Sequence, residues 1–209
     1  MIPKVTPQLR FICEGSFYIM DVQKNKQDFI AIVKKYIKRD GIDDLMAALE
    51  KEDFFIAPAS TKFHGAEEGG LCMHSMCVGK QLFKLAQLYD TQKEYTPETL
   101  AIVALFHDLC KIGCYKPDTR NVKNEYGQWE KVPCFKWEEQ FHYGGHGDKS
   151  VFLVMEHMAL TREEASAINT HMGFAGVSNV GTVSDVYNDN LLAWMLHVAD
   201  EAATYIDKY

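Results

Sequence analysis

Four residues of metal-binding types lie far apart along the chain, except that two of them are adjacent. His107 and Asp108 follow one another, whereas His74 and Asp200 belong to distant segments. Neutral imidazole binds transition metals well, and carboxylate adds charge neutralisation. Adjacent side chains on a helix point about 100° apart, so His107 and Asp108 can share one ion only if it lies near the helix surface between them. The other ligands must come from other helices, and His74 and Asp200 are the candidates.

Asp200 is a strong candidate because its neighbours are apolar. Ala193, Leu196 and Ala203 fall on the same side of the expected helix. An unpaired carboxylate there would cost several kcal/mol, so we expect a metal ion or a strong hydrogen-bond partner. A lone histidine on an apolar face is more often a hydrogen-bonded core residue than a ligand. The case for a metal centre therefore rests on the whole set, since packing would have to explain four buried polar groups separately.

Helices are predicted around all of these residues. The apolar periodicity favours helices over residues 24–39, 42–51, 71–89, 97–111, 148–158, 161–173 and 187–206. Thr96 can cap a helix that has Pro97 at its first position, and Thr161 with Glu164 matches a capping box. Residues 54–70 hold Pro58 and several glycines and read as a loop. For residues 11–19, the sequence is compatible with either a short strand or a packed arm.

Residues 113–140 differ from the rest, because strand-favouring residues replace the helical pattern. Tyr115, Val122, Trp129 and Trp137 flank a turn expected at 124–127. We therefore predict an all-α fold with a small inserted β-hairpin. Residues 1–55 are expected to be a helical lead-in packed on the core formed by residues 56–209, in one structural unit.

Composition narrows the class of protein further. The 209 residues are 47% hydrophobic, enough for one domain whose folding requires neither metal nor disulfides. An apolar run of about 18 residues is absent, so we expect no membrane span. Residues 1–10 lack the apolar core of a signal peptide, which favours a cytoplasmic protein. The six cysteines form no C-x-x-C pair, so buried reduced thiols are favoured over a structural zinc site.

The formal net charge of −7 limits the classes of binding partner that we expect. It counts against binding of duplex nucleic acid, which requires a basic face. A small phosphorylated substrate is still compatible, because a local basic cluster can hold it. A homo-oligomer is left open.

The order of the candidate residues resembles a known signature. The segments GGLCMHS (69–75), LFHDLCKI (105–112) and HVAD (197–200) resemble the H…HD…D signature of the HD-domain superfamily. The segments GHGDKS (145–150) and INTHMG (168–173) extend the likeness, which covers residues 63–207, about two thirds of the chain. The lead-in STKFHG (60–65) is similar to that of small HD hydrolases of bacteria and phages.

The resemblance implies an HD-domain helical bundle with one or two divalent ions, which could be manganese, iron, cobalt, nickel, zinc or magnesium. The residues implied around the first ion are His74, His107, Asp108 and Asp200. Asp108 would bridge to a second ion held by His146 and His171. Such ions polarise a phosphoryl group and supply a hydroxide. Alternatively, His146 and His171 contact the substrate phosphate or protonate the leaving group.

Lys111 is the expected partner of the phosphate. It lies three residues after Asp108 and so shares its helix face. In the resemblance it matches the lysine of the HD-x-x-K variant, whereas the mononucleotidase branch tends to carry a glutamate there. The alternative is a solvated lysine favoured by the helix dipole.

Further substrate contacts are expected from neighbouring basic residues and from His64. Lys116, Arg120 and Lys123 follow Lys111, and the segment 111–123 has a net charge of +3. It is either a site for a phosphate tail or a solvated hairpin end. His64 either lines the substrate pocket or makes only a local hydrogen bond.

The function predicted first is hydrolysis of a phosphate ester or anhydride, most simply on a nucleotide or deoxynucleotide. Asp108 and the metals would hold the geometry, and Lys111 would offset charge on the phosphoryl oxygens. A 3′-to-5′ nuclease or phosphodiesterase of the HD type is an alternative, although such enzymes usually add an oligonucleotide-binding barrel that has no room here. The same ligand types also suit an HD-fold di-iron oxygenase, and a non-catalytic binding module is left open as well.

Overall fold

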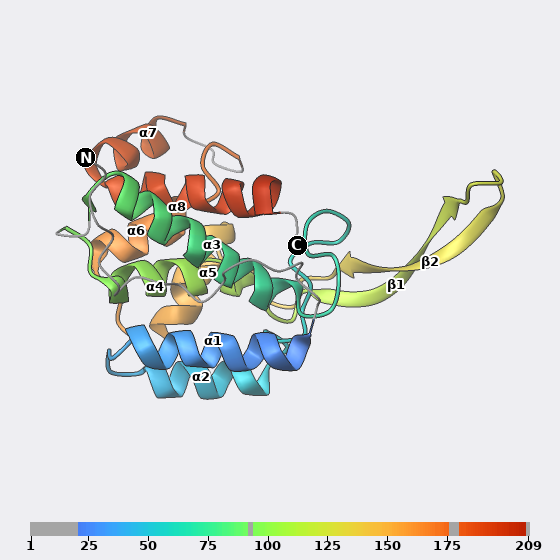
Figure 1. The fold of residues 1–209 in the computed structure, drawn as a ribbon, viewed down its shortest axis with the longest axis horizontal. Helices are drawn as coiled ribbons and strands as arrows, with labels where there is room; N and C mark the ends of the chain where they lie inside the picture. The colour runs from blue at the N-terminus through green and yellow to red at the C-terminus, as the bar shows by residue number, and fades with distance from the viewer. Residues whose placement is uncertain (1–20, 92–93, 176–179, 208–209) are drawn as a thin grey trace, which may run out of the picture.

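The computed structural model describes residues 21–91, 94–175 and 180–207, and it is mostly helical with one small antiparallel sheet (Figure 1). The segment 11–19 lies outside these residues. The helices are α1 (Val22–Tyr36), α2 (Ile42–Lys51), α3 (Gly70–Leu88), α4 (Pro97–Phe106), α5 (His146–Met155), α6 (Arg162–Thr170), α7 (Val180–Asp189) and α8 (Leu191–Ala202), with the short turns η2 (Leu109–Lys111) and η3 (Ala203–Asp207). Among the described residues, no helix combines the length and apolar character needed to cross a membrane.

The helices begin where the local sequence favours a start. The Thr96 side chain accepts a hydrogen bond from the Thr99 amide, and Pro97 occupies the first turn of α4. The predicted capping box of α6 is present between Thr161 and Glu164. Both predicted caps are confirmed, and each satisfies backbone N–H groups that a helix leaves without internal partners.

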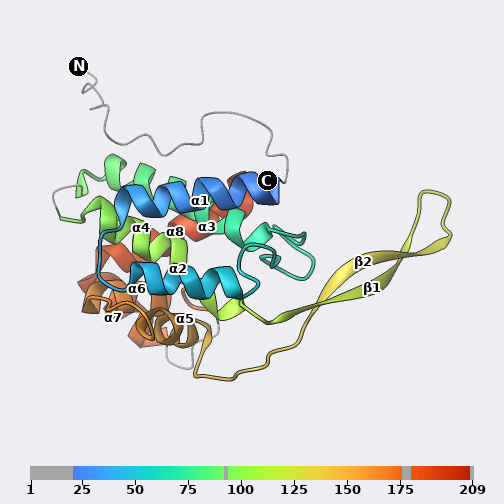
Figure 2. The same cartoon turned by 90° about the horizontal axis from the view of Figure 1, so that it is seen from below.

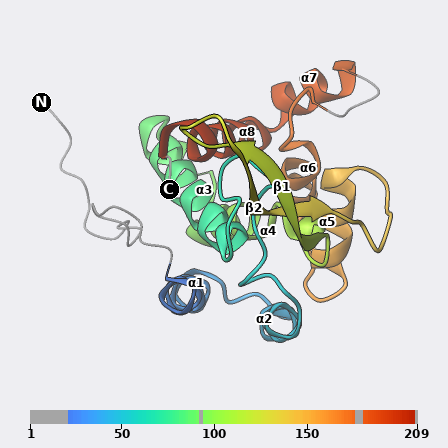
Figure 3. The same ribbon diagram turned by 90° about the vertical axis from the view of Figure 1, so that its right-hand side faces the viewer.

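The core is centred on α4, where every residue from Leu100 to Phe106 is buried. Helices α3 and α6 pack against it, α8 packs against α3 and α6, and α1 and α2 cover one side (Figures 1 and 3). Phe29 of α1 meets Phe54 and Phe106 edge-on, with ring centroids 5.0 and 6.2 Å apart. Each fully buried phenylalanine contributes about 1.5–3 kcal/mol. Buried side chains of α1 and α2 thus belong to the same apolar core as those of α3 and α4.

The hairpin leaves the helical body as a long arm (Figures 1 and 2). Strands β1 (Tyr115–Lys123) and β2 (Trp129–Trp137) are antiparallel, with Tyr115 opposite Trp137 and Lys123 opposite Trp129. The predicted turn is confirmed, with Gly127 at φ +73°. Only the root of the arm is buried, where the Tyr115 ring lies edge-on to Trp137 at 5.2 Å. The arm therefore starts beside η2 and ends far from the core.

Several helices end earlier than expected, among them α6, which ends at Thr170, and two expected helices differ most in their extent. The helix expected to reach Lys111 ends at Phe106, and Asp108 has non-helical angles of φ −110° and ψ 21°. The helix expected over 187–206 is divided at Asn190, whose backbone is extended. The Asn190 side-chain amide donates to the Glu163 carbonyl at 2.9 Å, and this contact with α6 favours the break. At the end of α4, the His107 ring likewise bonds the Ala104 carbonyl oxygen at 2.8 Å, so a side-chain bond to a backbone carbonyl accompanies both differences.

Candidate metal centre

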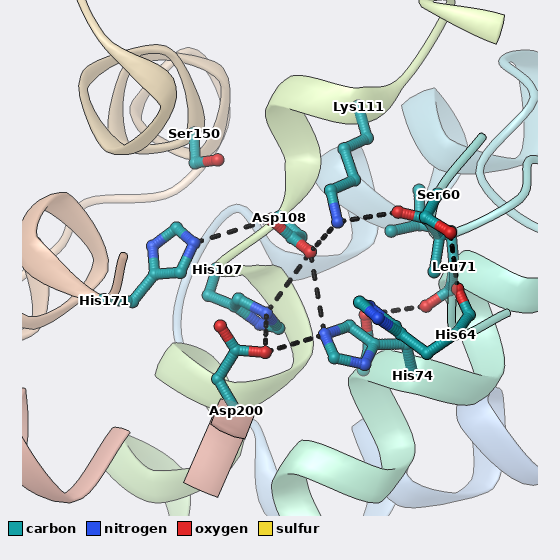
Figure 4. A network of polar contacts seen from close by, with 12 residues as sticks. Ser60, His64, Leu71, His74, His107, Asp108, Lys111, Ser150, His171 and Asp200 are labelled. Atoms are coloured by element: carbon teal, nitrogen blue, oxygen red, sulfur yellow. Dashed lines mark hydrogen bonds and ion pairs between the residues drawn. The ribbon is translucent and has the colours of Figure 1, made fainter. Parts of the chain in front are cut away.

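The four residues expected around one ion meet in the structure (Figure 4). His74 comes from α3, His107 and Asp108 from the end of α4, and Asp200 from α8. The His74 Nε2 atom lies 3.0 Å from Asp200 Oδ1 and 3.7 Å from Asp108 Oδ2. The His107 Nε2 atom lies 3.4 Å from Asp108 Oδ2 and 4.0 Å from Asp200 Oδ1. Three distant segments therefore present nitrogen and oxygen donors to one point.

A second group gathers at the other oxygen of the Asp108 carboxylate. His146, at the start of α5, places Nε2 at 2.8 Å from Asp108 Oδ1. His171, at the end of α6, places its Nε2 at 3.5 Å from the same oxygen. Three sets have donor atoms within 4.8 Å of one another: His74, His107 and Asp200; His107, Asp108 and His171; Asp108, Cys110 and His146. These buried histidine, aspartate and cysteine groups are able to hold a metal ion.

His107 and His171 are oriented in the same way, although they were expected inside helices. Each is the residue that ends its helix, α4 or α6, and each uses Nδ1 to bond the carbonyl oxygen three residues earlier. The distances are 2.8 Å from His107 to Ala104 and 2.6 Å from His171 to Ile168. A carbonyl only accepts, so Nδ1 carries the proton, and the lone pair of Nε2 faces the centre.

The spacing of His146 and His171 depends on a close backbone contact between α5 and α6. Gly147 follows His146, and a Cβ atom at this position would lie 2.0 Å from the Asn169 carbonyl oxygen. Such an approach excludes every side chain. On the other side, the His197 Nδ1 atom donates to the backbone oxygen of His171 at 2.8 Å. Both histidines are thus held through main-chain contacts.

Two ring nitrogens of the centre lack partners. Among the described residues, nothing makes a hydrogen bond to Nε2 of His107 or of His171, and both rings are fully buried. A buried polar atom without a partner costs about 1–3 kcal/mol. Each lone pair also faces a carboxylate oxygen, which offers no proton. A cation between nitrogen and oxygen would satisfy both, so the residues fit a bound metal.

The electrostatics favour neutral imidazole and ionised carboxylate. Burial lowers the pKa of His74 and of His171, with partial compensation by the aspartates. Burial raises the pKa of Asp108, but Lys111 and His107 lower it more, so that it falls below its ordinary value. The pKa of Asp200 is likewise lowered against burial, by its hydrogen bond to His74. These are the protonation states in which the side chains bind metal.

His107 is the exception among these histidines. Burial lowers its pKa, but the neighbouring Asp108 and Asp200 carboxylates more than offset this, so the pKa is raised. In the absence of metal, a proton on His107 is stabilised by the two carboxylates. A bound cation would interact with the same carboxylates in place of that proton.

Lys111 lies within the centre and is not a solvated residue at a helix end. Its Nζ atom is 2.7 Å from Asp108 Oδ2, and its side chain is only 13% exposed. Nζ also donates to the Ala59 carbonyl at 2.8 Å, and the Tyr115 hydroxyl donates to the same oxygen at 3.0 Å. The Asp108 charge raises the pKa of Lys111 even though burial lowers it. A permanent positive charge is therefore fixed beside the cluster.

His64 lies next to the first group of ligands. Its ring centroid is 4.9 Å from that of His74, and within the described part of the chain its buried Nε2 atom has no hydrogen-bond partner. Burial, and then the neighbouring His74, lower its pKa to about 4. The loop is shaped by Ser60, whose hydroxyl donates to the His64 carbonyl at 2.8 Å and accepts from the Phe63 amide. The local bond thus involves only the backbone of His64, and its ring is directed toward the centre.

The other basic residues expected to bind substrate are not brought to the centre. Lys116, Arg120 and Lys123 are exposed on β1. A strand rises about 3.3 Å per residue, so Lys123 lies roughly 26 Å beyond the first residue of β1. Lys123 instead places Nζ over the Trp129 ring at 5.2 Å. The structure supports a solvated hairpin for this segment.

Comparisons with protein-family models, with curated proteins and with solved structures each found no match. The interpretation of the centre therefore depends on the chemistry of its residues.

Cys110 is a residue of the centre that the sequence did not single out. Its sulfur belongs to the set with Asp108 and His146. Its amide donates to the Ser150 hydroxyl of α5 at 3.1 Å, which holds η2 against α5. The sequence predicts only a buried thiol here, and its position two residues after Asp108 was the one available signal.

Proposed function

We propose that this chain is a metal-dependent phosphohydrolase of the HD-domain type, acting on a phosphate ester or anhydride of a nucleotide or a similar small molecule. The observation that carries the proposal is the pair of buried Nε2 atoms, on His107 and His171, that face carboxylate oxygens with no hydrogen bond in the described residues. Hydrogen bonding and packing leave these atoms unsatisfied, whereas a divalent cation satisfies them.

The charge of the centre favours an anionic substrate once metal is bound. With neutral histidines, the two carboxylates of Asp108 and Asp200 and the ammonium of Lys111 give the metal-free centre a net charge of −1. One divalent cation reverses the sign to +1, and two give +3. A phosphate group then neutralises a buried positive charge that has no other counter-ion among these residues. A neutral substrate would not do so, which favours phosphate chemistry over oxidation of a C–H bond.

Each residue has a distinct role in this reaction. Bound metal would polarise the phosphoryl group and provide a hydroxide at neutral pH. Asp108 offers one oxygen to each group of ligands, and so fixes their separation. Lys111 uses two of its three N–H groups within the described residues, on Asp108 and Ala59, which leaves one for a phosphoryl oxygen. That N–H stabilises charge that grows on the oxygen in the transition state.

The test is phosphate release from a panel of nucleoside mono-, di- and triphosphates with manganese, cobalt, nickel, magnesium or zinc. The wild-type protein should bind metal and release phosphate without oxygen. Asp108→Asn preserves shape but removes the charge, and should lower turnover by on the order of 10³-fold together with metal content. Circular dichroism checks that the variant folds.

Three outcomes would contradict the proposal. Unchanged hydrolysis by Asp108→Asn would remove Asp108 from the reaction. Oxygen consumption with iron, without phosphate release, would favour the oxygenase. Cleavage of single-stranded oligonucleotides at rates far above those of mononucleotides would favour the nuclease.

A further inference from the structure

A thiol lies at the second group of ligands and has no role in the hydrolysis described above. The sulfur of Cys110, one oxygen of Asp108 and one ring nitrogen of His146 lie within 4.8 Å of one another. Cys110 is buried and forms no disulfide. Thiolate, carboxylate and imidazole together are a donor set typical of zinc and of other thiophilic ions.

Lys111 and His146, the histidine grouped with the Cys110 sulfur, contact different oxygens of the Asp108 carboxylate. Lys111 contacts Oδ2, the oxygen that also faces His74 and His107. Oδ1 instead faces His146 and His171, at 2.8 and 3.5 Å. The carboxylate thus separates the fixed ammonium of Lys111 from the two histidines, one of which, His146, has the Cys110 sulfur within 4.8 Å.

An unsatisfied atom on the Oδ1 side points independently to a ligand there. The His171 ring is fully buried, and its Nε2 atom has no hydrogen-bond partner in the described chain. Its ring centroid is 5.5 Å from that of His146, so the two imidazoles converge on the same oxygen. The proton on Nδ1 is used at Ile168, which leaves only the Nε2 lone pair for a cation.

We propose that Cys110 is a sulfur ligand of a second cation position formed with Asp108, His146 and His171, and that this position takes zinc, iron(II) or cobalt(II) in preference to magnesium. The inference rests on the proposed function only in requiring that the centre bind metal. The ion displaces the thiol proton to solvent as the metal–sulfur bond forms. Sulfur is a soft donor and magnesium a hard acceptor, so the thiolate selects between these ions.

Cys114 provides a matched control four residues later. It is also buried and free, but its sulfur lies 3.3 Å from the Cys110 carbonyl oxygen and 3.5 Å from the Lys149 ammonium. Replacement of either cysteine by serine exchanges only the sulfur atom for an oxygen atom. Only the Cys110 change should alter the metal.

The experiment loads the full chain with cobalt(II) and records its absorption spectrum during titration. The wild-type protein should show a thiolate-to-cobalt charge-transfer band in the near ultraviolet. Cys110→Ser should lose the band and bind one of two ions at least about tenfold more weakly. Cys114→Ser should keep the band and both affinities. X-ray absorption of the zinc-loaded wild type should detect a sulfur neighbour at about 2.3 Å.

The outcomes separate this inference from the proposed function. If the band persists in Cys110→Ser, Cys110 is not a ligand. The same follows if wild-type protein loaded with cobalt or zinc shows no sulfur ligation. Neither result bears on the proposed hydrolysis. Sulfur ligation without phosphate release would retain the ligand and overturn hydrolysis. The zinc measurement needs no variant, so a failure of Cys110→Ser to fold would not prevent a decision.

Discussion

The metal centre and the hairpin arm place charged residues in opposite ways. The centre takes side chains from α3, α5, α8 and the ends of α4 and α6, and gathers them around the Asp108 carboxylate. Figure 4 shows those from α3, α4, α6 and α8. The arm takes three basic residues from one continuous segment and separates them along β1. The lesson is that neighbours in sequence diverge on a strand, whereas helix ends from distant segments can converge.

The difference also determines how strongly each charge acts. Charges of the centre are buried, so solvent screens them little. On the arm, Lys116, Arg120 and Lys123 are exposed, and salt at 0.1 M screens interactions beyond about 10 Å. Substitutions in the two regions should therefore have very unequal effects.

The largest contrast is expected between two lysines that are close in sequence. Lys111→Ala should reduce kcat/KM on a phosphorylated substrate about 100-fold, because it removes the buried N–H donor beside Asp108. Metal content should not change. Lys116→Ala, at an exposed position next to the buried Tyr115, should reduce kcat/KM less than threefold. Equal losses in the two variants would show that the substrate spans both regions.

Alanine substitutions of glycines in the two regions should have different effects on stability and on metal affinity. Gly147→Ala would force a Cβ against the Asn169 carbonyl, destabilising the fold by about 1–3 kcal/mol and weakening the second ion about tenfold. Gly127→Ala, at the tip of the arm, meets no described atom within 4 Å and should cost only about 1 kcal/mol through its positive φ. Urea unfolding and metal titration measure both effects. Normal metal affinity in Gly147→Ala would disprove the backbone constraint.

The pH dependence of the stability of the metal-free protein should depend on the half-buried ring of His64. The pKa of His64 is lowered from 6.5 to about 4, so the unfolded chain binds a proton where the folded chain does not. The associated stability is complete above pH 6.5 and declines as the pH falls toward 4. His64→Gln should reduce the loss of unfolding free energy between pH 7 and 5. Urea unfolding at several pH values is the measurement, and an unchanged loss in His64→Gln would contradict the assignment to His64.

The smallest effect is expected at the far end of the arm. Lys123→Glu should change kcat/KM on a mononucleotide less than twofold at 0.1 M salt, since about 26 Å of strand separates it from the root. Steady-state kinetics at two salt concentrations is the measurement. A tenfold loss that disappears at high salt would mean that the arm reaches the substrate.

Sequence patterns predicted the parts of the fold that depend on local chemistry. Thr96, Pro97 and Thr161 determine helix starts through contacts within one turn, and the strand-favouring residues between Tyr115 and Trp137 predicted the hairpin. The end of α4 was missed because the His107 ring bonds a backbone carbonyl, which apolar periodicity does not register. The break at Asn190 was missed because it depends on α6, a distant element.

The same distinction applies to the centre. The meeting of His74, His107, Asp108 and Asp200 was predictable, because apolar surroundings make an isolated polar residue costly. Cys110 was not predictable in this way, since a buried thiol is acceptable without a partner. For the basic segment after Lys111 the sequence left two alternatives open, because a charge counted along the sequence does not show how far a strand separates its residues.

The hydrogen-bond acceptor shared by Lys111 and Tyr115 limits which sequence changes homologues of this protein can accumulate. That acceptor is the main-chain oxygen of Ala59, so any amino acid at position 59 supplies it, provided that it fits the buried space. Point substitution cannot abolish it. Insertions or deletions in the 54–70 loop would displace it, and homologues should therefore vary in the composition of this loop but keep its length.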